Sequence, residues 1–379
     1  QLEALDGTDI QFWDATQLAA ITSQQLAGLT TTGLADFSET QLASLTSTQL
    51  RGLTTSQLNS LGTTQLNALN AEDLSVTQIK GMNATAIEAL STTQAQSLTA
   101  SQIAALSAAG VEALSSEEIQ GWSTTQLAAL TSSQLSKLTT TAIADFSETQ
   151  LADLTATQVR GFTTTQLNSL GSTQLNAIEI ADLASTQIAG LNGTAAALLS
   201  STQVQGMSTA QVAALSTTAL GQLASTDIQD WSASQLGAVS TKQLAGLSTT
   251  AIANFSDTQL AALTTTQVRA FTATQLNTMA TTQLNALNAQ DLSVTQIKGM
   301  DATAMEALST TQAQSLTAAQ IANLSATGLD ALSSEEVQGW NTTQLAALTS
   351  SQLGKLTATA IADFSETQLA DLNATQVKG

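Results

Sequence analysis

The sequence contains no cysteine, proline, histidine or tyrosine among its 379 residues. Without cysteine there are no disulfides and no thiolate chemistry, which fits a secreted bacterial protein and a cytosolic protein equally well. Without histidine or cysteine, the usual acid–base and nucleophile arrangements of enzymes are missing. We therefore expect a protein that is not an enzyme and that has no catalytic residue, cofactor or metal site.

Positive charge is also scarce. Nine lysines and arginines stand against 29 aspartates and glutamates, so the formal net charge is −20. Nucleic-acid binding needs clustered cations, and so does binding to an anionic membrane surface. In addition, no apolar run approaches the ~18 residues of a membrane span. These counts argue against nucleic acid as a partner and against a membrane span.

The chain is rich in an eight-residue unit, of which Ser123–Leu130 (STTQLAAL) is a clear example. Variants of this octad follow from end to end, such as TSSQLSKL at 131–138, TTTQLNSL at 163–170 and STAQVAAL at 208–215. Serine or threonine occupies position 1, glutamine position 4, and apolar residues positions 5 and 8. The sequence is therefore expected to form a tandem-repeat array.

Positions 1 and 4 of the octad carry the signature of a capping box at a helix N-terminus. We expect the Ser123 hydroxyl to accept a hydrogen bond from the N–H of Gln126, whose side chain reaches back to the N–H of Ser123. Trp122 before the cap and Leu127 at N4 are both apolar, which indicates a hydrophobic staple. Each octad is thus predicted to start a helix of two turns, roughly 10 Å long at 1.5 Å per residue.

Helices this short are not stable alone, because nucleation is costly and few hydrogen bonds repay it. The units must therefore stack and bury residues such as Leu127 at position 5 and Leu130 at position 8. In one continuous helix the leucine stripe would drift by about 80° per repeat, so no straight partner could follow it. We predict an all-α solenoid, or superhelix, of very short capped helices. A β-solenoid is the alternative, since threonine favours strands.

A longer period is superimposed on the octads. Five-residue units begin at Asn70, Glu179 and Asn288, at intervals of 109 residues, and the tryptophans share this spacing, at Trp13, Trp122, Trp231 and Trp340. We predict one continuous array over 1–379, built of modules of thirteen octads and one pentad at 6–114, 115–223, 224–332 and, in part, 333–379. The pentads either set the superhelix or are deletions that were copied by duplication. The tryptophans occupy the position of leucine, so we expect them in the core rather than in an exposed sugar-binding row.

The acidic residues have two interpretations each. Adjacent carboxylates at Glu117/Glu118 and at Glu335/Glu336 could suggest glycosidase chemistry. They fall in the first turn of a predicted helix, where acids complement the helix dipole, and we favour this structural role. The stretch from Asp145 to Asp153 lacks the tight loop that calcium requires, so we expect a solvated acidic stripe.

The tandem Thr/Ser/Gln/Ala/Leu-rich units, the acidity and the lack of cysteine resemble the repeat regions of very large secreted bacterial surface proteins, of the adhesin and extracellular-filament type. The resemblance covers the whole chain. It implies a protein built for length and surface presentation, located outside the cell or on its surface, and exported by a dedicated route.

We therefore expect a structural repeat protein that forms an extracellular fibre, filament or surface layer by self-association, with copies of itself as the main partner. Three levels of repetition and the lack of polar capping units at the ends support this expectation. The alternative is an adhesin stalk or an array whose serine and threonine faces bind surface glycans or ice.

Overall fold

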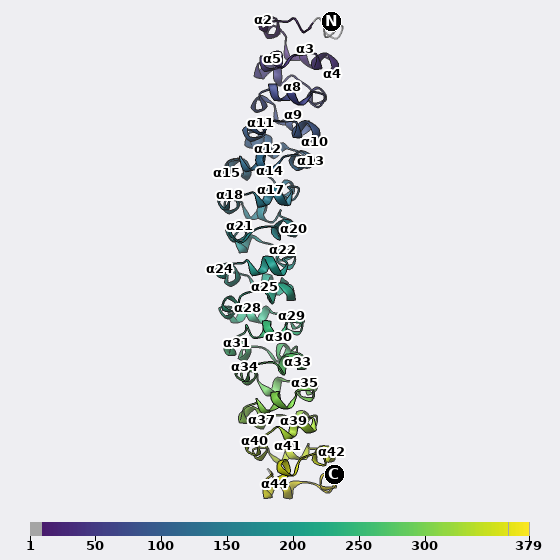
Figure 1. Ribbon diagram of the computed structural model, residues 1–379, viewed down its shortest axis with the longest axis vertical. Helices are drawn as coiled ribbons and strands as arrows, with labels where there is room; N and C mark the ends of the chain where they lie inside the picture. Colours follow the sequence, from purple (N-terminus) through teal and green to yellow (C-terminus); the bar gives the residue numbers. More distant parts are fainter. Residues whose placement is uncertain (1–9, 363, 379) are drawn as a thin grey trace. The chain divides into compact units, whose positions relative to one another are not determined.

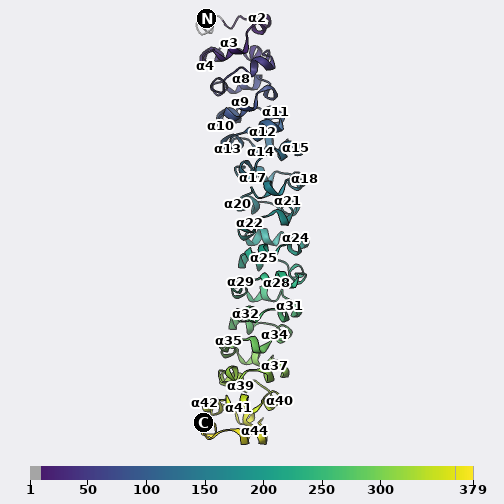
Figure 2. The same ribbon diagram turned by 180° about the vertical axis from the view of Figure 1, so that it is seen from behind.

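The computed structural model describes residues 10–362 and 364–378. The chain divides into two compact units, Gln1–Gln187 and Ile188–Gly379, and each is built in the same way. Within each unit short helices follow one another around a coil (Figures 1 and 2). The described residues contain helices and turns but no strand, which confirms the predicted all-α class and leaves the β-solenoid alternative without support.

The helices up to the boundary between the units are α2 (Ala15–Ala19), α3 (Ser23–Ala27), α4 (Thr31–Ala35), α5 (Glu39–Ala43), α6 (Ser47–Leu50), α7 (Thr55–Leu58), α8 (Thr63–Ala68), η2 (Ala71–Asp73), α9 (Val76–Gly81), α10 (Ala84–Glu88), α11 (Thr92–Ser97), α12 (Ala100–Ala105), α13 (Ala108–Glu112), α14 (Ser116–Gln120), α15 (Thr124–Ala128), α16 (Ser132–Leu135), α17 (Thr140–Ala144), α18 (Glu148–Ala152), α19 (Ala156–Val159), α20 (Thr164–Leu167), α21 (Ser172–Ala177), η3 (Ile180–Asp182) and α22 (Ser185–Ala189).

The remaining helices are α23 (Gly193–Ala197), α24 (Ser201–Gln205), α25 (Thr209–Ala214), α26 (Thr217–Leu220), α27 (Ser225–Gln229), α28 (Ala233–Ala238), α29 (Thr241–Gly246), α30 (Thr249–Ile252), α31 (Asp257–Ala261), α32 (Thr265–Val268), α33 (Ala273–Leu276), α34 (Thr281–Ala286), η4 (Ala289–Asp291), α35 (Val294–Gly299), α36 (Ala302–Glu306), α37 (Thr310–Ser315), α38 (Ala318–Ile321), α39 (Ala326–Asp330), α40 (Ser334–Gln338), α41 (Thr342–Ala346), α42 (Ser350–Leu353), α43 (Ala358–Ala362), α44 (Glu366–Asp371) and α45 (Ala374–Val377).

One octad shows why each helix is so short. Ser123 has extended backbone angles (φ −67°, ψ 161°), and α15 begins at the next residue and ends at Ala128. The following octad begins at Thr131, which is again extended (φ −79°, ψ 156°) and caps α16. A new cap every eight residues, each with a non-helical backbone, ends one helix and starts the next.

The coil is closed by packing between each unit and units that come three and four positions later along the chain. Helices three positions apart lie against each other, for example α5 and α8, α9 and α12, or α18 and α21. Glutamine side chains link units four positions apart: Gln134 Nε2 donates to the carbonyl oxygens of Ile103 and Leu106, both at 2.9 Å. One turn of the coil therefore takes between three and four repeat units.

The core of each unit of the chain is a file of apolar side chains from positions 5 and 8. Leu127 is 1% exposed and Leu130 is 2% exposed. Small residues at position 7 allow adjacent turns to approach closely. A Cβ atom added at Gly161, for example, would lie 2.5 Å from the carbonyl oxygen of Ser132, so a larger residue there would push the turns apart.

Candidate functional site

The side chain of Gln126 acts in two directions. Its Oε1 accepts from the N–H of Ser123 at 2.9 Å, and its own N–H donates to Ser123 Oγ at 3.4 Å, which makes the capping box. Its Nε2 donates to the carbonyl oxygens of Gln96 and Leu98, both at 2.8 Å, in the preceding turn. One amide therefore starts its own helix and also ties it to the turn before.

This second role of glutamine was missed by the sequence analysis, which assigned it to capping alone. The same pair of cross-turn bonds recurs through both compact units, for example from Gln243 to the carbonyls of Val212 and Leu215 at 2.9 and 2.8 Å. The available signal was chemical: a cap needs only an acceptor at position 4, whereas the sequence supplies an amide, which also donates.

The tryptophans at position 8 join the same bonding scheme. Trp122, Trp231 and Trp340 are 2%, 4% and 3% exposed, and each indole N–H donates to a backbone carbonyl three units earlier. The acceptors are Ala95, Val204 and Ala313, at 2.8, 2.9 and 3.0 Å. Trp13 is only partly buried and makes an edge-to-face contact with Phe37, at 6.4 Å between ring centroids and 88° between planes.

Tryptophan fits because its neighbours are altered around it. Ala95 occupies position 5 of its unit, where most units have leucine or isoleucine, so the smaller side chain leaves room for the Trp122 ring. Since the indole takes the Ala95 carbonyl, Gln126 binds the next carbonyl, that of Gln96. The substitution is therefore a matched set of residues 27 to 30 positions apart.

The pentads that begin at Asn70, Glu179 and Asn288 form the short 3₁₀ helices η2, η3 and η4. Each pentad occupies the place of one octad. Gln78, the first glutamine after η2, donates to the carbonyls of Leu50 and Leu53 at 2.8 Å, three residues closer than the spacing seen elsewhere. The order of stacked units thus continues through the pentad without a reset of phase.

All three arginines of the sequence bind pentads. Arg51, Arg160 and Arg269 donate from Nε to the carbonyl oxygens of Asp73, Asp182 and Asp291, at 3.0, 3.3 and 3.1 Å. The sequence analysis did not connect these residues. The signal was their shared interval of 109 residues, which matches that of the pentads.

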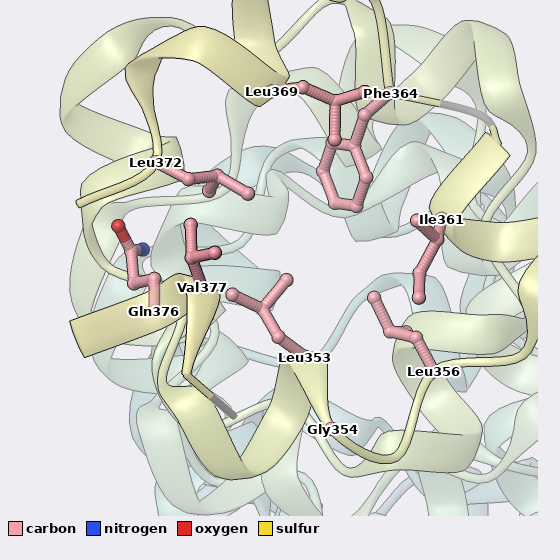
Figure 3. Close-up of a pocket in the computed structure, with 9 residues that line it drawn as sticks. All are labelled: Leu353, Gly354, Leu356, Ile361, Phe364, Leu369, Leu372, Gln376 and Val377. Atoms are coloured by element: carbon pink, nitrogen blue, oxygen red, sulfur yellow. The ribbon is translucent and has the colours of Figure 1, made fainter. Parts of the chain in front are cut away.

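The largest cavity described lies in the last turn of the second unit and has a volume of about 520 Å³ (Figure 3). Leu353, Leu356, Phe364, Leu369 and Val377 point into it from positions 5 and 8 of successive units. Elsewhere another turn covers such residues, whereas here Leu369 is 43% and Val377 is 68% exposed. The cavity is thus the uncovered core face of one turn of the coil.

Over residues 10–362 and 364–378, no three histidine, cysteine, aspartate or glutamate side chains converge as a metal site would require. Within the same residues, every helix is too short and too polar to span a bilayer. The candidate sites are therefore the turn-to-turn contacts themselves.

Comparison with known proteins identifies the chain as a repeat protein. Residues 103–140 and 236–273 match the family model described as the ALTTAQ repeat. No curated protein matches the sequence. Among solved structures, the leucine-rich repeat-containing protein LegL7 from Legionella pneumophila aligns with 62% of this chain and 84% of its own, at 13% identity and a TM-score of 0.15.

Proposed function

We propose that the protein is a structural repeat protein, which forms an extracellular fibre, filament or surface layer by self-association. The observation that carries this proposal is the way units connect. Each ordinary octad donates from its glutamine to the unit four positions before it and offers carbonyls to the unit four positions after it. Such a coil can be lengthened one unit at a time without any new kind of contact.

The surface and the core of the coil also fit a structural role. Positions 5 and 8 are consumed by packing, and the glutamines by the cross-turn bonds, so what faces water is mainly serine, threonine and carboxylates. With a net charge of −20, this surface keeps separate coils apart unless specific contacts join them. The uncovered leucines around the cavity in Figure 3 show the kind of apolar face that one turn offers to another.

Sedimentation and cryo-electron microscopy of the purified 379-residue chain test self-association. We expect oligomers or filaments whose abundance rises with protein concentration, with an axial spacing related to the 109-residue module. Leu369→Glu places a charge on the uncovered apolar face, while Glu366→Lys on the same helix changes a charge away from that face and is the matched control. A chain that stays monomeric at high concentration would refute self-association.

A binding role is the second candidate, and one surface feature favours it. An open cavity of about 400 Å³ is lined by Ser132, Ser133, Ser136, Thr157 and Arg160, which together offer hydroxyl groups and one cation to a polar ligand. Surface glycans have suitable chemistry. A glycan array and a thermal-hysteresis assay against ice, each with a sequence-scrambled control, test this role, and flat results in both would exclude it.

A further inference from the structure

The units that carry tryptophan differ from other octads at position 4. Glu118 precedes Trp122, Asp227 precedes Trp231 and Glu336 precedes Trp340, each by four residues, where most units have glutamine. These acids are as buried as the glutamines they replace: their side chains are 6%, 5% and 6% exposed. A buried acid recurring beside each of these tryptophans is unlike the exposed carboxylates of the rest of the chain.

Glu118 keeps only half of the bonding that a glutamine makes at this position. Its Oε2 accepts from the N–H of Ser115 at 2.6 Å and from Ser115 Oγ at 2.9 Å, as the glutamine Oε1 does in other capping boxes. Glu336 repeats the contact with the N–H of Ser333 at 2.6 Å. The second carboxylate oxygen, Oε1, therefore takes the place of the amide nitrogen.

In an ordinary octad that nitrogen donates to two carbonyls of the unit four positions earlier. Ile87 and Leu90 hold the corresponding places for Glu118, and Met305 and Leu308 for Glu336. A carboxylate oxygen has no proton to donate to these acceptors, so three oxygen atoms face one another. Such an arrangement is costly in a buried place unless something positive lies between the oxygens.

We propose that Glu118 and Glu336 each hold a hard cation, such as Ca²⁺, between the carboxylate and the two facing backbone carbonyls. All the protein donors are oxygen atoms, which calcium prefers and transition metals do not. Across the described residues every fully buried side-chain oxygen has a hydrogen-bond partner. Glu118 Oε1 has none, so it keeps some contact with solvent, from which water can complete the coordination shell.

Asp227 provides a natural contrast within the chain. Its side chain is one methylene shorter, and Ala224, which precedes its helix, has no hydroxyl with which to complete a capping box. Its Oδ1 lies only at the margin of hydrogen-bonding distance from Thr226 Oγ1, at 3.4 Å. Because its carboxylate is not held as those of Glu118 and Glu336 are, we expect this position to bind the cation more weakly.

The test compares two double variants of the full chain. Glu118→Gln with Glu336→Gln restores the common amide, whereas Glu117→Gln with Glu335→Gln removes the same charge from exposed neighbours in the same helices. Isothermal titration with Ca²⁺ counts the sites, and Tb³⁺ emission sensitised by the nearby tryptophans reports occupancy. We expect the first pair to lose two calcium sites per chain and most of the Tb³⁺ emission, and the control pair to lose neither.

Thermal unfolding in Ca²⁺ and in EGTA separates the cation from a proton. If a cation bridges the oxygens, calcium raises the Tm of the wild type and of the control pair but not that of Glu118→Gln with Glu336→Gln. If the acids instead carry their own protons, that variant is as stable as the wild type or more so in both buffers, and no calcium is bound. That result, or equal calcium binding by both pairs, would overturn the proposal. The proposal rests on the fold alone, so its failure would leave the structural role of the coil untouched.

Discussion

An ordinary octad and a pentad hold equivalent places in the coil, although they differ in length by three residues. The octad Thr131–Leu138 forms α16 and sends Gln134 Nε2 to two carbonyls in the preceding turn. The pentad Asn70–Leu74 forms only η2 and has no glutamine, and its Asp73 carbonyl is instead bound by Arg51 of an earlier turn. The coil therefore counts repeat units rather than residues.

What the two kinds of unit share shows what a unit must supply. Ala71 and Leu74 of the pentad are 1% and 3% exposed, like positions 5 and 8 of an octad. Their carbonyls accept from Gln102 Nε2, both at 2.8 Å, in the same way as octad carbonyls accept from later glutamines. Two buried apolar side chains and two correctly placed carbonyls are enough, while a capped helix and a glutamine can be omitted.

The largest effect is expected from core truncation, and it should be equal in the two kinds of unit. Leu135 of the octad is fully buried and Leu74 of the pentad is 3% exposed. Replacing either by alanine should cost about 2–5 kcal/mol, since each leaves a cavity in a packed core. Denaturant unfolding with hydrogen exchange to locate the damage measures both. A much smaller cost at Leu74 would show that the pentad is a passive deletion and not a working unit.

Removal of the cross-turn amide should have the next largest effect. Gln134→Ala deletes the donor to the Ile103 and Leu106 carbonyls and leaves these buried acceptors unpaired, at about 1–3 kcal/mol. Thr131→Ala, in the same capping box, should cost about 0.5–2 kcal/mol through the cap alone. Hydrogen exchange distinguishes them: Gln134→Ala should speed exchange in the preceding turn as well as in α16. Damage confined to α16 in both variants would mean that the cross-turn bonds contribute nothing.

The sequence predicted what is local to a unit and missed what joins units. The capping hydroxyls, the short helices and the leucine core follow from residues within eight positions of each other, where helix periodicity is informative. The number of units per turn did not follow, because it depends on contacts such as Gln134 to Ile103, 31 residues apart. The partnerships of Trp122 with Ala95 and of Arg51 with Asp73 were missed for the same reason.

The arginine at the pentad should have a smaller effect than the glutamine of the octad. Arg51 is exposed, and its bond to the Asp73 carbonyl is one hydrogen bond at 3.0 Å. Arg51→Ala should cost about 0.5–1.5 kcal/mol and raise hydrogen exchange at η2. Lys137→Ala, which removes an exposed cation from an octad, is the control and should leave exchange at η2 unchanged. Equal behaviour of the two variants would reduce the arginine to a surface charge.

The smallest effect is expected at position 3 of an octad. Thr125 is exposed and its hydroxyl makes no hydrogen bond to the described residues, whereas the hydroxyl of Ser123, two residues earlier, completes a capping box. Thr125→Ala should therefore change the free energy of unfolding by less than about 0.5 kcal/mol. Ser123→Ala should cost about 1 kcal/mol. Thermal unfolding of the two variants side by side measures the difference. If Thr125→Ala were as costly as Ser123→Ala, the position-3 hydroxyls would be part of the coil's own support, and they would no longer be a surface free to meet a glycan or another coil.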